Sequence, residues 1–197
     1  MSDSDFIKIR FNRIPPKVMK NEIENVVITS QNGVEALLNS FTKDEMNFKN
    51  IFCVGRRTKK LIENRIGKVA HVAKNALKLG EYLSTELTKK EVTYFCSDLR
   101  LDTLPSYLKE NGVVVNEVEA YKTMFSPVKI NNQVSGVLFF SPSGIDSYLQ
   151  KNSTNKVAFC IGETTEAQAR KHFKNVQVSN LPSVDSILEL VNTHFSK

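Results

Sequence analysis

The stretch VLFFSPSGIDSYL, residues 137–149, passes from an apolar run through a small polar turn into residues with helical spacing. Nearly the same stretch occurs earlier as VVITSQNGVEALL, residues 26–38. In both copies a serine ends the apolar run and a glycine follows three residues later. The matched pairs, each 111 residues apart, are Ser30 with Ser141 and Gly33 with Gly144. The pattern is typical of a strand that leads into a helix, because a serine can cap the free amides of a helix start.

A second pattern recurs in the same order. IFCVGRRT (51–58) and AFCIGETT (158–165) share Phe-Cys, an apolar residue, a glycine and a threonine three residues later. The two glycines, Gly55 and Gly162, are 107 residues apart. Two ordered repeats at nearly constant separation favour an internal duplication, with two related halves built of strand-turn-helix units. The alternative is that strand-to-helix turns of any origin favour serine and glycine.

Short apolar runs alternate with helical periodicity along the whole chain, which predicts an α/β fold with parallel sheets and helices on both faces. Strands are expected at 26–29, 51–54, 69–72, 92–96, 113–120, 137–140, 157–161 and 176–178. Helices are expected at about 31–40, 57–65, 76–88, 102–110, 143–151, 165–173 and 183–194. The stretch SPVKINNQ, 126–133, is the best linker between the halves, and the crossing is expected near 122–129.

Composition is that of an ordinary folded protein: 197 residues, 41% hydrophobic and 24% charged. The start of the chain lacks the apolar stretch of a secretory signal, and no run approaches the roughly 18 apolar residues that cross a bilayer. We therefore expect a cytoplasmic protein with no membrane partner. The cysteines lie in apolar runs and are expected to be buried reduced thiols: Cys53, Cys96 and Cys160. The histidines are scattered without metal-ligand spacing, so no metal site is expected.

The serine turns have a direct physical interpretation. Ser141 can cap the next helix, and Pro142 suits its first position. Thr165 followed by Gln168 resembles a capping box. In parallel sheets such turns lie at the carboxyl ends of strands, where ligands bind and helix amides can contact anions. The glycines of these turns, Gly33, Gly55, Gly144 and Gly162, would let a ligand approach the backbone. The alternative is that the turns only cap helices, as every α/β protein requires.

Charge indicates what kind of ligand to expect. The formal net charge is +6, and GRRTKK (55–60) places four cations at a helix start, where the macrodipole disfavours them. A bound anion would compensate, although a solvated basic face with local pairing to Glu63 is an equal alternative. No basic segment interleaved with aromatic residues is present, so nucleic acid is not the expected partner. A small polyanion fits better.

Several motifs in order then carry a family resemblance. ITSQNGV, FCVGRRT, FCSDLRLDTLPSYLKENGV (95–113), EVEAYKT (117–123), FFSPSG and IGETT together resemble uroporphyrinogen-III synthase over nearly the whole chain. The resemblance implies two related α/β domains with parallel sheets, a flexible two-strand linker and a ligand cleft between them. It also implies a cofactor-independent lyase of heme biosynthesis, which cyclises hydroxymethylbilane to uroporphyrinogen III with loss of water and inversion of ring D. Such an enzyme mainly folds its substrate so that the inverted attack prevails.

The resemblance also assigns residues. Tyr121 would be catalytic, its phenol donating to the departing hydroxyl group, although it could merely pack in a connecting strand. The expected substrate-binding residues are Thr29, Ser30, Gly55, Thr58, Ser97, Ser141, Ser143, Gly144, Gly162, Thr164 and Thr165. Leu99, Leu104 and Leu108 are expected in the core. The partner would be a small polycarboxylate tetrapyrrole, with no cofactor and no metal, and the protein would be a monomer.

Three positions depart from the family pattern. Ser97 stands where glycine is frequent and could crowd the backbone, and Glu163, often proline, is expected to point outward. Members usually begin with a strand-helix-strand unit, whereas IKIRF (7–11) already resembles the crossing between domains. The first domain is therefore expected at 8–122, with connecting segments near 7–13 and 117–124, and the second at 125–197 without that unit. The alternative function is a phosphosugar-binding sensor or regulatory module, which can share a strand followed by Ser-x-Ser-Gly.

Overall fold

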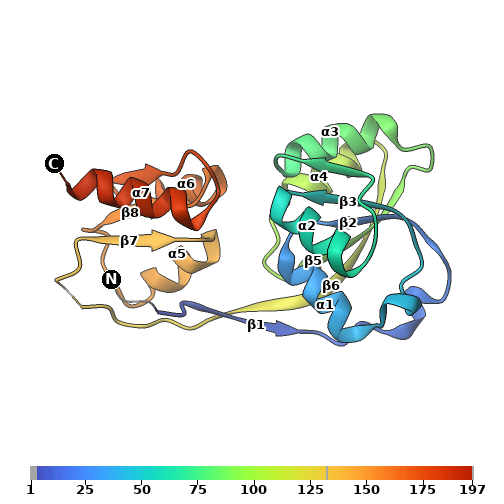
Figure 1. The fold of residues 1–197 in the computed structure, drawn as a ribbon, viewed down its shortest axis with the longest axis horizontal. Helices are drawn as coiled ribbons and strands as arrows, with labels where there is room; N and C mark the ends of the chain where they lie inside the picture. The colour runs from blue at the N-terminus through green and yellow to red at the C-terminus, as the bar shows by residue number, and fades with distance from the viewer. Residues whose placement is uncertain (1–3, 132, 197) are drawn as a thin grey trace. The chain divides into compact units, whose positions relative to one another are not determined.

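The computed structural model describes residues 4–131 and 133–196, so Asn132 of the expected linker lies outside the described residues. The chain forms two compact units. The larger unit is Ile9–Thr123, and the smaller unit combines Met1–Lys8 with Met124–Lys197. Figure 1 labels the elements along the chain.

The larger unit is built on a sheet with the strand order β1-β6-β5-β2-β3-β4. These strands are β1 Ile7–Phe11, β2 Ile23–Ile28, β3 Phe48–Val54, β4 His71–Ala73, β5 Glu91–Ser97 and β6 Val114–Phe125. Neighbours from β6 to β4 pair in parallel. The edge strand β1 runs antiparallel to β6, because Asn12 N–H bonds to Ala120 while Ser126 N–H bonds to Phe6. All the parallel strands therefore end at one edge of this sheet.

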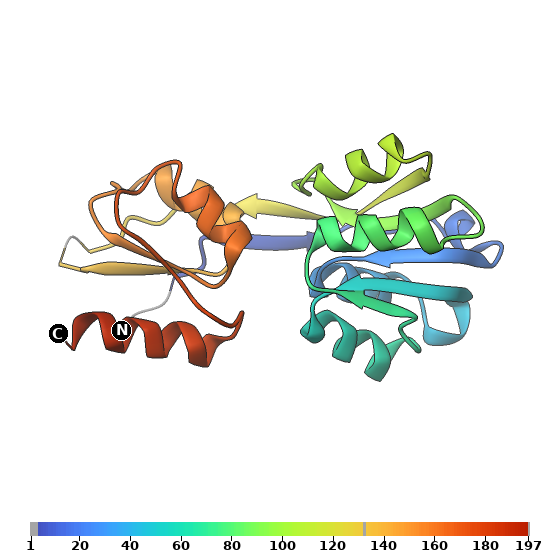
Figure 2. The ribbon, with the colours of Figure 1, turned by 90° about the horizontal axis from the view of Figure 1, so that it is seen from above.

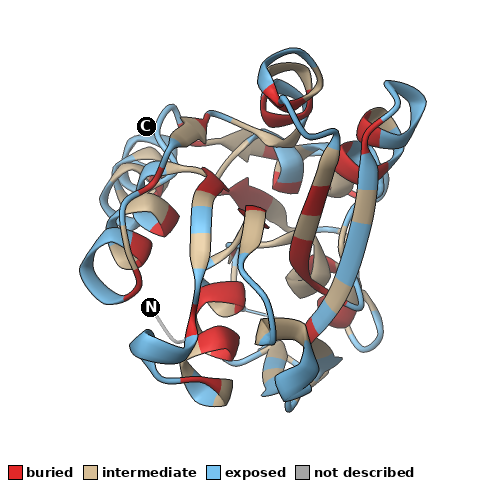
Figure 3. Ribbon diagram, turned by 90° about the vertical axis from the view of Figure 1, so that its right-hand side faces the viewer, coloured by how far each residue is buried: buried red, intermediate tan, exposed pale blue. Residues whose placement is uncertain are grey.

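Helices cover both faces of this sheet (Figure 2): α1 Gln31–Ser40, α2 Arg56–Arg65, α3 Ala76–Glu86 and α4 Thr103–Glu110. Successive strand residues point to opposite faces. Val26 and Ile28 of β2 accordingly pack in one core cluster with α1 and α2, whereas Val27 packs in the other with α3 and α4. Buried residues concentrate along the inner strands and on the sheet-facing sides of the helices (Figure 3).

The smaller unit has a parallel sheet in the order β7-β8-β9, with β7 Gly136–Phe139, β8 Val157–Cys160 and β9 Val176–Val178. Its helices are α5 Pro142–Leu149, α6 Glu163–Ala169 and α7 Val184–Phe195. The core centres on Tyr148, whose ring meets that of Phe139 edge-on at 5.3 Å between centroids. Phe6, from the start of the chain, packs against the same core, with its ring 5.6 Å from that of Tyr148.

The two units share a longer series of elements than the two sequence motifs cover. The strands β2, β3 and β4 lie side by side in that order, and so do β7, β8 and β9. A third strand-helix unit, β4 with α3, therefore has a counterpart in β9 with α7. Both of these helices begin at a side-chain cap, Asn75 and Ser183.

The α/β fold with parallel sheets flanked by helices is confirmed, and each expected strand and helix is present with small shifts at its ends. The largest shift is in β6, which continues to Phe125 through the expected crossing. Two short 3₁₀ helices were not predicted: η1 Pro16–Met19 and η2 Lys43–Glu45. The three cysteines are buried and free, as predicted. Among the described residues, no helix has the length and apolar character needed to span a membrane.

The capping box expected at Thr165 and Gln168 is wrong. α6 already begins at Glu163, with Gly162 as its N-cap. Thr165 consequently lies inside the first turn and is 3% exposed. The Gln168 amide instead donates to Asp146 on α5 at 2.5 Å. A glutamate at the first position is favourable beside the positive end of a helix, which explains the earlier start.

The expectation that Leu99 lies in the core is also wrong. Leu104 and Leu108 are buried on α4 as expected, but Leu99 is 48% exposed. It lies in the turn between β5 and α4, before the helical periodicity begins. The turn directs its side chain away from the core.

Candidate functional site

Predicted site residues of the larger unit gather at the carboxyl ends of neighbouring parallel strands. Thr29 and Ser30 follow β2, Gly55 follows β3, Ser97 ends β5, and Tyr121 lies on β6. Because parallel strands end at the same sheet edge, this is the position where open α/β sheets bind ligands. The structure therefore brings most of the larger unit's candidates to one edge.

Ser30 and Tyr121 are in direct contact. Ser30 is the N-cap of α1, and its Oγ accepts a hydrogen bond from Gly33 N–H at 3.2 Å. The same Oγ lies 2.8 Å from the Tyr121 hydroxyl oxygen. Burial raises the pKa of Tyr121, so its phenol keeps its proton at neutral pH. The serine cap and the candidate catalytic phenol thus form one hydrogen-bonded pair.

Thr29 contacts a different phenol, which the sequence did not single out. Its Oγ1 lies 2.9 Å from the hydroxyl oxygen of Tyr94 on β5. Tyr94 is almost fully buried, and burial raises its pKa to about 12. Because Tyr94 stands among apolar neighbours in its strand, the sequence pattern indicates only an ordinary core position.

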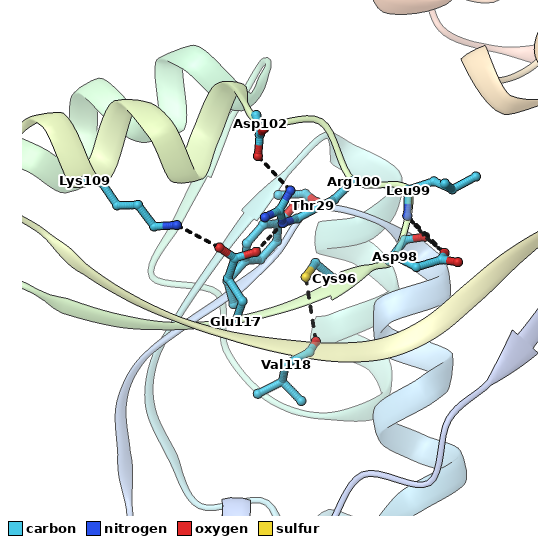
Figure 4. Close-up of polar contacts among 11 residues, drawn as sticks. Thr29, Cys96, Asp98, Leu99, Arg100, Asp102, Lys109, Glu117 and Val118 are labelled. Atoms are coloured by element: carbon cyan, nitrogen blue, oxygen red, sulfur yellow. Dashed lines mark hydrogen bonds and ion pairs between the residues drawn. The ribbon is translucent and has the colours of Figure 1, made fainter.

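Ser97 supports the turn after β5 with its hydroxyl. The hydroxyl donates to Asp98 Oδ1 at 2.9 Å and accepts from Leu99 N–H at 3.1 Å. Figure 4 shows the adjacent hydrogen bond from Leu99 N–H to Asp98 Oδ1. It also lies 3.2 Å from Thr123 Oγ1 on β6. The Ser97 side chain therefore stabilises the turn through its own hydrogen bonds.

The turn at Gly55 combines backbone conformation with positive charge. Gly55 has φ +81°, a left-handed conformation that strongly favours glycine, and it caps α2. Arg56 and Arg57 follow and are exposed, with no ion pair to any residue that the structure describes. Thr58, in the same turn, is 5% exposed. The expected basic helix start is therefore present at the strand ends.

The serine turn of the smaller unit repeats the geometry around Ser30. Ser141 Oγ accepts from Gly144 N–H at 3.1 Å and lies 3.0 Å from Ser143 Oγ. Pro142 occupies the first helical position, as predicted. The structure brings these three candidates, Ser141, Ser143 and Gly144, into one half-buried turn.

The glycine turn of the smaller unit differs from its counterpart. Gly162 has φ −176°, an extended conformation open to any residue. Thr164 is exposed, whereas Thr165 is almost buried. Glu163, which stands at the position equivalent to Arg56, is exposed as expected. Because β7 and β8 are parallel neighbours, the Ser141 and Gly162 turns lie at the same edge of their sheet.

An ionic cluster explains part of the motif LRLD, residues 99–102 (Figure 4). The Arg100 guanidinium bonds to Glu117 of β6 and, at 2.8 Å, to Asp102. Lys109 of α4 reaches the other Glu117 oxygen at 3.1 Å. The Arg100 hydrogen bond holds the pKa of the Glu117 carboxyl below its usual range. The cluster ties the β5–α4 turn and α4 to strand β6.

A pocket of about 210 Å³ in the larger unit lies at the opposite, amino ends of its strands. It is lined in part by Asn25 and Asn50, whose amides bond to each other at 3.2 Å. Asn25 also donates to the carbonyls of Lys89 and Glu91. These amides are paired within the protein, so the candidate site remains the carboxyl edge.

The two units, each with hydroxyl and glycine turns at the carboxyl ends of its parallel strands, define a two-unit α/β protein, a class in which ligands commonly bind at that edge. A family model described as uroporphyrinogen-III synthase HemD matches residues 4–189. The chain therefore belongs to the uroporphyrinogen-III synthase family, whose members are enzymes of heme biosynthesis.

Solved structures agree on the fold. The chain is similar to uroporphyrinogen-III synthetase from Helicobacter pylori 26695, with 18% identity, a TM-score of 0.71, and coverage of 96% of this chain and 91% of that one. It is also similar to a mutant uroporphyrinogen III synthase from the extremely thermophilic bacterium Thermus thermophilus, with 12% identity, a TM-score of 0.68, and coverage of 97% and 87%. At these identities the likeness shows the fold alone.

Proposed function

We propose that this chain cyclises hydroxymethylbilane to uroporphyrinogen III, eliminating water and inverting ring D, as a cofactor-independent lyase. Membership of the family is the observation that carries the proposal, and it favours the synthase over the phosphosugar-binding alternative. We take the two units as the two domains predicted at 8–122 and 125–197. The enzyme would act in the cytoplasm as a monomer on a small polycarboxylate, without nucleic acid or membrane partners.

Tyr121 is the proposed catalytic residue. Its O–H would donate to the substrate hydroxyl as the C–O bond breaks and water leaves. The contact with Ser30 supports this role. Ser30 Oγ already accepts the Gly33 amide, and its own proton can be donated to the phenol oxygen. In that arrangement the phenol proton is available to the substrate.

The proposed carboxylate-binding groups are helix-start amides and turn hydroxyls. In the larger unit they are Thr29, Ser30, Gly55, Thr58 and Ser97, and in the smaller unit Ser141, Ser143, Gly144, Gly162, Thr164 and Thr165. Gly55 is supported best, because its left-handed conformation begins a helix whose first residues are exposed cations. Thr29 and Ser97 already contact Tyr94 and Asp98, so they would also orient their neighbours.

Charge distinguishes the two glycine turns. The first turn of α2 carries Arg56 and Arg57, whereas the equivalent positions of α6 are Glu163 and Thr164. A polycarboxylate would therefore be attracted more strongly to the turn of the larger unit. We propose Arg56 and Arg57 as substrate-binding residues in addition to those inferred from sequence.

An isomer assay tests the function. Freshly generated hydroxymethylbilane is added to the purified protein, and the oxidised products are resolved by chromatography into type I and type III uroporphyrin. Type III above the spontaneous background is the expected result. Type I alone would contradict the proposal. Tyr121→Phe keeps the ring but removes the donor, and we expect it to lower kcat by ~10²-fold or more, the usual size of a general-acid contribution.

A further inference from the structure

The turn after β5 is hydrogen-bonded to strand β6 at Tyr121 and Thr123. Asp98 N–H donates to the Tyr121 carbonyl at 3.3 Å. Asp98 Oδ1 accepts hydrogen bonds from Ser97 Oγ at 2.9 Å, Leu99 N–H at 3.0 Å and Thr123 N–H at 2.9 Å. Asp98 thus bonds to the β6 backbone at Tyr121 and again two residues later.

These hydrogen bonds lie beside an irregularity in the pairing of β5 with β6. Cys96 pairs with Glu119, but the next residue, Ser97, pairs with Tyr121, so Ala120 is an extra residue on β6. A β-bulge of this kind redirects the side chains that follow it. Because side chains alternate along a strand, the direction of the Tyr121 phenol depends on where β6 resumes its register. That point is where Asp98 holds the strand.

We propose that Asp98 is a positioning residue for Tyr121: its carboxylate fixes β6 beyond the bulge so that the phenol meets the Ser30 cap. The inference rests on the proposed catalytic role of Tyr121. Asp98 is exposed, so its carboxylate fills no place in the core. Its negative charge also contributes to raising the pKa of Tyr121, after the larger effect of burial, which helps the phenol keep its proton.

A double-mutant cycle tests the proposal. Asp98→Ala, Tyr121→Phe and the double variant are compared for kcat, KM, the ratio of type III to type I product, and the urea midpoint of unfolding. We expect Asp98→Ala to lower kcat by ~10-fold or more, since a small misplacement of a catalytic group is costly, and to change KM less than about twofold. In the Tyr121→Phe background the same change should have almost no further effect on kcat.

Two further variants separate position from charge. Asp98→Asn keeps an oxygen that can accept the same hydrogen bonds and should retain most of the kcat. Asp98→Glu keeps the charge but displaces the acceptor, so it should lose kcat, and it serves as the test if Asp98→Ala does not fold. The matched control is Asp102→Ala, which removes an exposed carboxylate from the same turn and should leave kcat near the wild-type value.

The possible outcomes are distinguishable. Wild-type protein that forms no type III product contradicts the proposed function itself. Tyr121→Phe with wild-type kcat contradicts the role of Tyr121 and, with it, the role of Asp98. Losses of kcat that multiply in the double variant, or an Asp98→Ala variant that loses only stability, would overturn the positioning role while leaving the function intact.

Discussion

Gly55 and Gly162 occupy equivalent places after β3 and β8, yet only Gly55 requires glycine for its backbone conformation. Gly55 has φ +81° and Gly162 has φ −176°. A Cβ added at either position would meet no atom within 4 Å, so a difference between them isolates the backbone conformation. We expect Gly55→Ala to lower the free energy of unfolding by about 1–3 kcal/mol, the cost of holding a residue with a Cβ in a backbone conformation of positive φ that such residues rarely adopt. Gly162→Ala should be neutral or slightly stabilising.

Urea unfolding of the two alanine variants measures this difference. Each variant is the control for the other, because the substitution is the same and both glycines lie between a strand and a helix. Equal losses of stability at both positions would contradict the argument from backbone conformation.

Single residues were predictable where the interaction is local in sequence. Ser30 and Ser141 each bond an amide three residues away, and a serine before a helical pattern indicates that bond directly. Tyr94 and Asp98 were missed because their partners, Thr29 and Thr123, are distant in the sequence. The capping box at Thr165 was wrong because the residue spacing alone does not fix where the helix begins, and the observed N-cap, Gly162, lies three residues earlier.

At the scale of one element, the first turn of α2 carries two cations at a position where positive charge lowers the stability of the helix. Arg56 and Arg57 lie at the positive end of the helix, where each cation costs about 0.3–1 kcal/mol. The double variant Arg56→Gln with Arg57→Gln should therefore unfold at higher urea concentration than the wild type. If these cations bind substrate carboxylates, KM should rise by ~10-fold or more, as two charge-assisted contacts are lost. The value of kcat should change little.

Opposite signs make this experiment decisive. Weaker substrate binding in a more stable protein cannot result from misfolding. Arg65→Gln in the last turn of α2 is the control: it removes a favourable cation from the negative end, so stability should fall slightly while KM stays constant. If the double variant has an unchanged KM, Arg56 and Arg57 do not bind the substrate.

Most strands and helices could be predicted because apolar runs alternate with helical periodicity and clear turn residues separate them. The exceptions depend on contacts made after folding. Strand β6 continues through the expected crossing to Phe125, along the antiparallel partner β1, which no local pattern in 121–125 indicates. The 3₁₀ helices η1 and η2 lie in connections where the sequence has no helical period.

At the scale of the whole molecule, each core cluster contains one buried thiol. Burial raises the pKa of Cys53 and Cys96 to about 11 and that of Cys160 to about 12, from an unfolded value of 9.0. Above pH 9 the unfolded chain releases thiol protons that the folded protein retains. The free energy of unfolding should therefore fall as pH rises, approaching about 1.4 kcal/mol per pH unit for each thiol.

Urea unfolding at pH 8, 8.5, 9 and 9.5 measures this slope, since the buried tyrosines, whose unfolded pKa is 10.0, contribute much less than the thiols in this range. Cys160→Ala should be less stable at pH 7 because it leaves a small cavity, but its stability should depend less on pH than that of the wild type. Identical slopes for the two proteins would mean that the Cys160 thiol is not protected in the folded state.

The two-unit organisation was predictable from the repeats, since each copy carries its own strand-turn-helix signals. The unequal size of the two sheets was predictable as well, because five strands are expected in the first half and three in the second. Both sheets contain three consecutive parallel strands, and β5, β6 and β1 extend only the larger one. The pairing of β1 with β6 at the edge was not predictable, because this long-range contact leaves no periodic mark in either repeat.

Because Phe6 and Tyr148 are far apart in the sequence, the core of the smaller unit can be completed only late in synthesis. The larger unit is continuous, so it can fold once Thr123 has left the exit tunnel. Phe6 is made before any of it, but the Tyr148 ring that it meets is made long afterwards. During that interval the aromatic ring at the start of the chain is exposed on a nascent protein that is already folded behind it.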